Sequence, residues 1–193
     1  MVVRMATRVG GAGGYRHYQK HQKRGDKTMP VAIVLGAPPC VAFVAPMKLP
    51  IDLDEVGVAG GVAGAPINVV KAKTVDLLVP ADAEIVIEGL IDLEHVEPEG
   101  PFGESHGHVA LEQFNMPMRV TAITHRRNAV VASYLSQVTP SESSAIKRVS
   151  FEPMFLSHLR NTLGIKAVKR VTLHERMTAL RRMTIVTVEQ GTP

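Results

Sequence analysis

The sequence predicts an α+β protein in which a closed or partly closed β-barrel is followed by the start of an α/β domain. Several short runs rich in Val and Ile alternate with turn residues, and only short helical segments separate them. The pattern changes near residue 139, where a helical recurrence begins. The chain has 193 residues, which is more than one average domain of about 150. We therefore expect a first domain over 1–138 and a truncated second domain over 139–193.

The expected first domain begins with a strand and a polar helix. Residues 1–7 alternate between apolar and polar and run into a glycine-rich turn, and 15–24 follow a helical pattern that stops at Gly25. Short helices are expected at 38–45, with proline in the first turn, and at 53–64, before a group of glycines. Further strands are expected at 30–36, 67–74, 84–93, 118–125 and 130–135, with a turn at 79–82 and the last two strands paired as a hairpin.

The expected second domain starts with one long helix over 141–163, which Gly164 ends. Two strands, over 168–173 and 183–188, follow it before the chain ends. One helix and two strands are too few to close a sheet with both faces covered. We therefore expect the chain to be a fragment of a longer protein.

The composition predicts a soluble protein. Hydrophobic residues make up 45% of the chain and charged residues 21%, proportions that are typical of globular domains. No apolar run reaches the roughly 18 residues that a membrane-spanning helix needs, so no membrane span is expected. The chain has one cysteine, Cys40, and its start lacks the pattern of an export signal. The expected location is the reducing cytoplasm.

The charge pattern argues against a nucleic-acid partner. The chain has no tryptophan and only 4% aromatic residues, so the stacking platform of a single-strand binder is missing, and no DNA-reading motif is present. The net charge of +4 combines a basic start with an acidic centre. Such segregation fits a small anionic ligand held near a carboxylate-bound cation, although solvated charged faces produce it as well.

A glycine-rich run lies directly before the first predicted helix. Its glycines are Gly10, Gly11, Gly13 and Gly14. Unhindered N–H groups at a positive helix end are a good seat for phosphate. Arg8 and Arg16 flank the run and favour an anion. A glycine hinge is the alternative interpretation, because the run lacks the Lys and the Ser or Thr that complete a P-loop.

Glu88 lies near the end of an apolar strand, on the face that it shares with Val86. A carboxylate on such a face needs a cation or hydrogen-bond donors. The alternative is that strand twist turns Glu88 to water, and the rarity of buried Glu favours this alternative when spacing alone is considered.

The motif Thr139-Pro-Ser-Glu142 predicts the start of the long helix. Thr139 as N-cap, proline at the first helical position and Glu142 at the third would form a capping box. From spacing alone Glu142 is a capping residue, because caps outnumber catalytic acids.

Four motifs resemble the UbiD family of reversible decarboxylases and occur in that family's order, covering most of residues 1–145. They are Met29-Pro-Val-Ala-Ile-Val-Leu-Gly36, Val75-Asp-Leu-Leu-Val-Pro-Ala-Asp-Ala-Glu-Ile-Val-Ile-Glu-Gly89, Glu99-Gly-Pro-Phe-Gly-Glu104 and Thr121-Ala-Ile-Thr-His-Arg126. The resemblance implies a split β-barrel, flavin-reductase-like, which is the family's central domain, followed by the start of an α/β domain.

The resemblance also implies a cofactor and the residues that hold it. The cofactor would be prenylated FMN, bound through its phosphate by Mn2+ or another divalent cation, with K+ nearby. His17 and Glu88 would ligate the metal, and Glu142 would be the general acid–base group. The cofactor-binding residues would be Arg8, Gly10, Gly11, Gly13, Gly14, Arg16 and His17.

Two functions from different classes follow. The first is reversible non-oxidative decarboxylation of an aromatic or α,β-unsaturated carboxylic acid, with release of CO2, by a homo-oligomer that receives its cofactor from a flavin prenyltransferase. The second is a catalytically silent flavin-binding or structural module that requires another chain. The second is considered because the family's asparagine ligand and catalytic arginine would lie before Met1.

Overall fold

The computed structural model describes residues 2–5, 13–47, 49–50, 53–103, 109–111, 113–131, 133–135, 140–173 and 183–191. The chain forms two compact units, each built from several segments. The first, here called the sheet unit, combines Met1–Pro38, Pro66–Pro101 and Leu111–Ala132. The second, the helical unit, combines Pro39–Ala65, Phe102–Ala110 and Ser133–Pro193.

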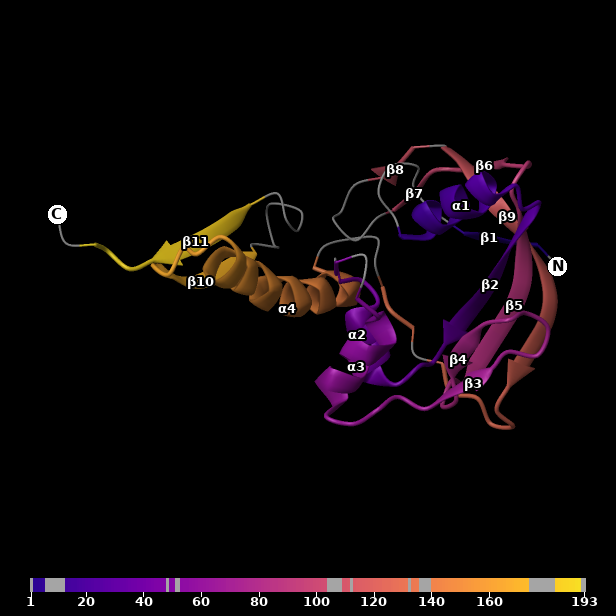
Figure 1. Ribbon diagram of the computed structural model, residues 1–193, viewed down its shortest axis with the longest axis horizontal. Helices are drawn as coiled ribbons and strands as arrows, with labels where there is room; N and C mark the ends of the chain where they lie inside the picture. The colour runs from indigo at the N-terminus through magenta and orange to yellow at the C-terminus, as the bar shows by residue number, and fades with distance from the viewer. Residues whose placement is uncertain are drawn as a thin grey trace. The chain divides into compact units, whose positions relative to one another are not determined.

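The sheet unit is built around one antiparallel sheet. Its elements are β1 (Val2–Met5), α1 (Gly13–Arg24), β2 (Thr28–Leu35), β3 (Val69–Lys71), β4 (Leu78–Pro80), β5 (Ile85–Asp92), β6 (Glu97–Glu99) and β9 (Gln113–His125). The main sheet has the order β1-β9-β5-β2, with β6 also paired to β9 (Figure 1). The strands β3 and β4 pair separately as a short hairpin, and residues 72–77 form its tip.

Helix α1 covers one face of the main sheet. Met29, Ile91 and Met118 are neighbours in the strand register, and all three are buried against Tyr18 of α1. Successive side chains of a strand point to opposite faces. Glu88, three positions before Ile91 on β5, therefore projects from the face opposite α1.

The helical unit contains four helical segments and two short sheets among its described residues. Its elements are α2 (Pro39–Val44), α3 (Glu55–Ala63), β7 (Phe102–Gly103), β8 (Val109–Ala110), α4 (Glu142–Ser157), a π-helical turn (His158–Thr162), β10 (Val168–Leu173) and β11 (Thr184–Val188). A small core forms where Phe151 of α4 and Leu173 of β10 are both buried, with Met154 and Phe155 packed against them. Glu152 stabilises the same contact, because its Oε1 accepts the Leu173 N–H at 2.9 Å.

The helix boundaries follow from local chemistry. Asp54 caps α3 by accepting the Gly57 N–H at 2.9 Å, and Gly64 ends it with a φ of +71° that a side chain would strain. The expected helices near 15–24, 38–45 and 53–64 are present as α1, α2 and α3. The long C-terminal helix and the two strands after it are present as well.

Three sequence expectations about strands are wrong. The segment 67–74 forms a strand only over Val69–Lys71. The turn expected at 79–82 is confined to Ala81 and Asp82, because Val79 and Pro80 belong to β4. No hairpin joins 118–125 to 130–135, since the described residues there after Arg126 form no strand. The physical reason is that the Val130 N–H donates to the Glu84 side chain, at 3.1 Å, instead of to a strand.

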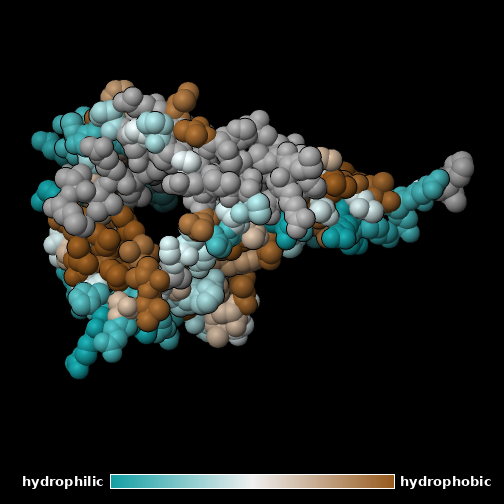
Figure 2. Space-filling view, turned by 180° about the vertical axis from the view of Figure 1, so that it is seen from behind, coloured by the Kyte–Doolittle hydropathy of each residue, from teal (hydrophilic) through white to brown (hydrophobic). Residues whose placement is uncertain are grey.

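Large hydrophobic side chains remain exposed in both units. Examples are Leu78, Leu111, Leu135 and Val188. Figure 2 shows brown hydrophobic patches of this kind on one face of the molecule. Among the described residues, no helix has the length and apolar character needed to cross a membrane.

Candidate functional site

The first turn of α1 offers a seat for an anion. Gly13 and Gly14 begin the helix, no acidic residue lies in its first turn, and Arg16 is exposed close to its start. The free N–H groups and the helix dipole at such an end favour negative charge. Of the predicted cofactor-binding residues, Arg8, Gly10 and Gly11 lie outside the described residues. The chemistry of the described part fits a phosphate.

Helix α1 is fastened to the sheet by the residue next to His17. The buried Tyr18 donates its hydroxyl to the Leu93 carbonyl at 2.7 Å, and Gln22 donates to the same carbonyl at 3.0 Å. Tyr18 and Gln22 are one helical turn apart and therefore face the sheet together. His17 points away from this contact and is exposed.

An open pocket lies beside this anchor. It has a volume of about 280 Å³, and α1, β9 and the segment before β6 line it. Its walls include Tyr15 and Tyr18, whose rings are stacked with their centroids 5.9 Å apart, together with Phe114 and Met116. The lining holds amides but no charged side chain, so the pocket does not suit a carboxylate or a phosphate.

Glu88 is buried, with 1% of its surface exposed. Its Oε1 accepts the Lys73 N–H at 2.8 Å, and its Oε2 accepts the Thr74 N–H at 2.6 Å and the Thr74 hydroxyl at 2.7 Å. The alternative that strand twist turns Glu88 to water is therefore wrong. A carboxylate on this face was expected to need hydrogen-bond donors or a cation, and Lys73 and Thr74 supply the donors.

The same contacts decide the protonation state of Glu88. Burial by itself raises the pKa of the Glu88 carboxyl, but the hydrogen bonds from Lys73 and Thr74 lower it by more, so the pKa lies below its usual value. Glu88 is therefore an anion at neutral pH. A protonated carboxyl could not accept all three hydrogen bonds equally well.

The predicted metal ligands His17 and Glu88 come from different elements of the sheet unit. His17 belongs to α1, which packs on one face of the sheet, and Glu88 projects from the other face. Within the described ranges, no three His, Cys, Asp or Glu side chains form a group that could hold a metal ion. The assignment of both ligands stays a prediction.

Glu142 is the first residue of α4 and is exposed. Its Oε2 accepts the Leu135 N–H at 2.9 Å. The expected capping box of Thr139 and Glu142 is wrong: the N-cap is Ser141, and the reciprocal hydrogen bonds join Ser141 and Ser144. Serine can fill both positions because its hydroxyl both donates and accepts. Glu142 is thus free of the capping role.

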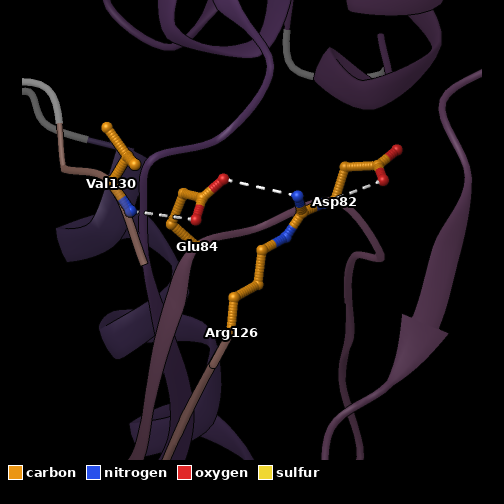
Figure 3. Close-up of polar contacts among 4 residues, drawn as sticks. All are labelled: Asp82, Glu84, Arg126 and Val130. Carbon is orange, nitrogen blue, oxygen red and sulfur yellow. Dashed lines mark hydrogen bonds and ion pairs between the residues drawn. The ribbon is translucent and has the colours of Figure 1, made fainter. Parts of the chain in front are cut away.

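A polar cluster that sequence reasoning did not identify ties the ends of three strands together (Figure 3). The Arg126 guanidinium lies 3.1 Å from Asp82 and 3.5 Å from Glu84. The Glu84 N–H donates to the carbonyls of Leu35 and Gly36, both at 3.2 Å. These contacts join the ends of β2 and β9 at the start of β5.

Gly36 is required for this junction. Its φ is +66°, and a Cβ there would lie 2.5 Å from Cγ of Glu84. Both facts exclude a side chain at this position. The only sequence signal for the cluster was the position of Gly36 and Arg126 at strand ends.

The sequence matches one protein family over most of its length. The family described as "UbiD: 3-octaprenyl-4-hydroxybenzoate carboxy-lyase Rift-related domain" matches residues 3–138. An uncharacterized protein of Synechocystis sp. is 39% identical over 152 residues, which are 79% of this chain and 30% of that protein.

Two solved structures are similar to the whole fold. The UbiD-class enzyme HmfF of Pelotomaculum thermopropionicum, in an evolved dimeric form in complex with prFMN, gives a TM-score of 0.85 at 28% identity, over 98% of this chain and 43% of its own. The closed form of vanillic acid decarboxylase from Sedimentibacter hydroxybenzoicus gives a TM-score of 0.78 at 25% identity, over 91% of this chain and 36% of its own. The chain spans less than half the length of each of these proteins.

Proposed function

Because the chain belongs to the UbiD family, we propose that it is part of a carboxy-lyase that uses prenylated FMN. The reaction is the reversible, non-oxidative decarboxylation of an aromatic or α,β-unsaturated carboxylic acid. The observation that carries this proposal is the likeness, at a TM-score of 0.85 over 98% of the chain, to a UbiD-class enzyme in complex with prFMN. In this proposal the antiparallel sheet is one part of a split β-barrel.

The cofactor phosphate is assigned to the start of α1. Gly13 and Gly14 leave its first N–H groups accessible, and Arg16 adds positive charge. We extend this assignment to Arg8, Gly10, Gly11 and His17, which adjoin that turn in sequence. When bound, prenylated FMN supplies the electron sink that makes loss of CO2 feasible. The protein's part is to hold and orient the cofactor and to exclude water.

Glu142 is assigned the proton transfer. A general acid–base group must gain and lose a proton during turnover, so it cannot be held by strong donors in one state. Among the described residues, Glu142 accepts one hydrogen bond, from the Leu135 N–H to its Oε2. As an acid, Glu142 delivers a proton to the carbon that has lost CO2, and in the carboxylation direction it removes that proton.

Mn2+ or another divalent cation, and K+, belong to the proposal for the longer protein. The described residues contribute one anionic candidate, Glu88, whose buried carboxylate has a pKa below its usual value because of the hydrogen bonds that it accepts. His17 stays the second proposed ligand, and no step of the reaction is assigned to a metal here.

A second candidate is favoured by the exposed apolar surface. All five residues of β11 are exposed, and its sheet has only two strands among the described residues. Such a surface is expected to be covered by further polypeptide or by another copy of the chain in a homo-oligomer. The same surface is expected of the second candidate function, a catalytically silent module, because its partner chain would cover the exposed strand.

One experiment separates the two candidates. The chain is co-expressed with a flavin prenyltransferase, purified without oxygen, and examined by its flavin spectrum and metal content, followed by a screen of aromatic and unsaturated acids for CO2 release. Bound modified flavin together with CO2 release that Glu142→Gln abolishes supports the carboxy-lyase. Bound flavin with no CO2 release, restored only by a partner chain, supports the module. A chain that binds neither FMN nor prenylated FMN contradicts the carboxy-lyase and the flavin-binding form of the module, and supports a structural module.

A further inference from the structure

The tip of the β3–β4 hairpin surrounds the carboxylate of Glu88. The successive N–H groups of Lys73 and Thr74 each donate to one of its oxygens, at 2.8 and 2.6 Å, and the Thr74 hydroxyl adds a third hydrogen bond at 2.7 Å. Consecutive backbone N–H groups that converge on one anion form a nest. The anion here comes from the chain itself, 14 and 15 residues further along.

A change of strand register lies directly opposite Glu88. On β9, Ala122 pairs with Glu88 while Val120 pairs with Gly89, so Thr121 is left without a partner residue on β5. Such a bulge redirects the side chain of the extra residue. The Thr121 hydroxyl consequently lies 2.6 Å from the Thr74 hydroxyl.

The direction of the hydrogen bonds follows from the proton count. The carboxylate of Glu88 has no proton to give, so the Thr74 hydroxyl donates its only proton to Oε2. The proton between the two hydroxyls must then come from Thr121. The result is a directed chain from Thr121 to Thr74 to Glu88.

Gly89 allows the two strands to come close enough for this arrangement. A Cβ at Gly89 would lie 2.5 Å from the Arg119 carbonyl oxygen and 2.9 Å from Cγ of Met118. The nearest of these atoms belongs to the backbone of β9, which cannot shift without disturbing the strand pairing. Two neighbouring residues therefore make this arrangement possible. Glu88 accepts hydrogen bonds from the hairpin, and Gly89 lets the bulged strand β9 approach β5 closely.

We propose that these residues form a latch in which Glu88 fastens the tip of the β3–β4 hairpin to the sheet and Thr121, aimed by the bulge, acts as a positioning residue through Thr74. This inference does not depend on the proposed decarboxylation. While the latch is closed, Oε2 of Glu88 accepts two hydrogen bonds and both of its lone pairs are engaged. Bidentate binding of a cation by Glu88 and a closed latch therefore exclude each other.

The test is amide hydrogen exchange, followed by NMR on the whole chain, at Lys73 and Thr74. In Thr121→Val we expect both amides to exchange about threefold to tenfold faster, because loss of one hydrogen bond weakens the closed state. Thr121→Ser keeps the hydroxyl and should restore the wild-type rate. Glu84→Gln is the matched control, since Glu84 also accepts a backbone N–H, from Val130, and should leave these amides unchanged. Glu88→Gln should give a larger acceleration than Thr121→Val.

Several outcomes overturn the proposal. Unchanged exchange in Thr121→Val, or exchange in Thr121→Ser as fast as in Thr121→Val, removes the positioning role of Thr121. Retained protection of Lys73 and Thr74 in a folded Glu88→Gln variant removes the latch itself. If Glu88→Gln does not fold, the two Thr121 variants decide, with the amides of β2 and β5 reporting that the sheet is intact. If a variant loses flavin or activity while the amides of Lys73 and Thr74 stay protected, the result contradicts the proposed function and leaves the latch in place.

Discussion

Glu88 in the sheet unit and Glu142 in the helical unit are the two carboxylates of the proposed function, and their surroundings are opposite. Glu88 is 1% exposed and accepts three hydrogen bonds. Glu142 is exposed and accepts one, from Leu135. A carboxylate held by several donors keeps one position and one charge, whereas a carboxylate with one donor can change both. The difference fits a structural role for Glu88 and the proton transfer that we propose for Glu142.

The largest expected effect comes from Glu142→Gln. If Glu142 transfers the proton, CO2 release by the cofactor-loaded protein should fall about 10²- to 10⁴-fold, because general acid–base catalysis contributes that much. Flavin content should stay the same, since Glu142 is not assigned to the phosphate seat. The measurement is initial rate together with the flavin spectrum of the purified variant. A variant that keeps its rate would return Glu142 to a purely structural role and remove the contrast with Glu88.

Glu88→Ala should have the largest effect on stability. It leaves the part-buried N–H groups of Lys73 and Thr74 without their acceptor, and an unsatisfied buried donor costs about 1–3 kcal/mol. We expect the free energy of unfolding to fall by about 3 kcal/mol, measured by urea denaturation. The control is Glu142→Ala, which exposes no buried donor and should change stability by less than about 1 kcal/mol. Equal losses in the two variants would contradict the comparison.

The sequence predicted the position of Glu88 on an apolar strand face because alternation is a local property of a strand. It did not predict which groups satisfy the carboxylate, since backbone N–H donors 14 and 15 residues away have no residue-type signature. The bulge at Thr121 was missed for a related reason. Strand register depends on pairing between segments far apart in the chain, and a single-residue shift leaves no local pattern.

The start of α4 shows a different limit. The sequence predicted a capping box two residues too early, with Thr139 in place of Ser141, because Thr, Pro, Ser and Glu all suit several capping positions. The structure selects Ser141 because Ser144 lies three residues later and returns the hydrogen bond. The general acid–base role proposed for Glu142 came only from the family resemblance, because no local sequence pattern indicates it.

Gly89→Ala tests the strand contact beside Glu88. The added methyl group meets the Arg119 carbonyl at 2.5 Å, so the backbone must shift. Overpacking of this kind typically costs about 1–3 kcal/mol, and we expect about 2 kcal/mol by urea denaturation. Gly100→Ala is the matched control, because no atom lies within 4 Å of a Cβ there. If both substitutions cost the same, the close approach of β5 and β9 is not what requires the glycine.

The pH dependence of stability offers a smaller and more specific test of Glu88. Burial raises its pKa, and the hydrogen bonds from Lys73 and Thr74 lower it by more, so the folded value lies below the unfolded one. Glu88 therefore contributes stability that is present above the unfolded pKa of about 4.3 and is lost as pH falls through the folded value. Urea denaturation between pH 7 and pH 3 should show the wild type converging on Glu88→Gln in acid. A constant difference between the two proteins would mean that the carboxylate charge contributes nothing.

The smallest effect is expected at the Arg126 cluster, which resembles the Glu88 site in joining strand ends but lies nearer to water. Arg126 is 47% exposed and Asp82 62%, whereas Glu84 is 18% exposed. Exposed ion pairs contribute about 0.2–1 kcal/mol, so Asp82→Asn should cost less than about 0.5 kcal/mol and the cost should vanish in 1 M salt. Glu84→Gln should cost more than Asp82→Asn, because Glu84 also accepts the Val130 N–H. An equal, salt-sensitive cost for both variants would show that charge pairing, and not the backbone hydrogen bond, holds this junction. Glu88 on β5 and Glu84 beside it would then stabilise the sheet by different interactions, hydrogen bonds to backbone N–H groups at Glu88 and charge pairing at Glu84.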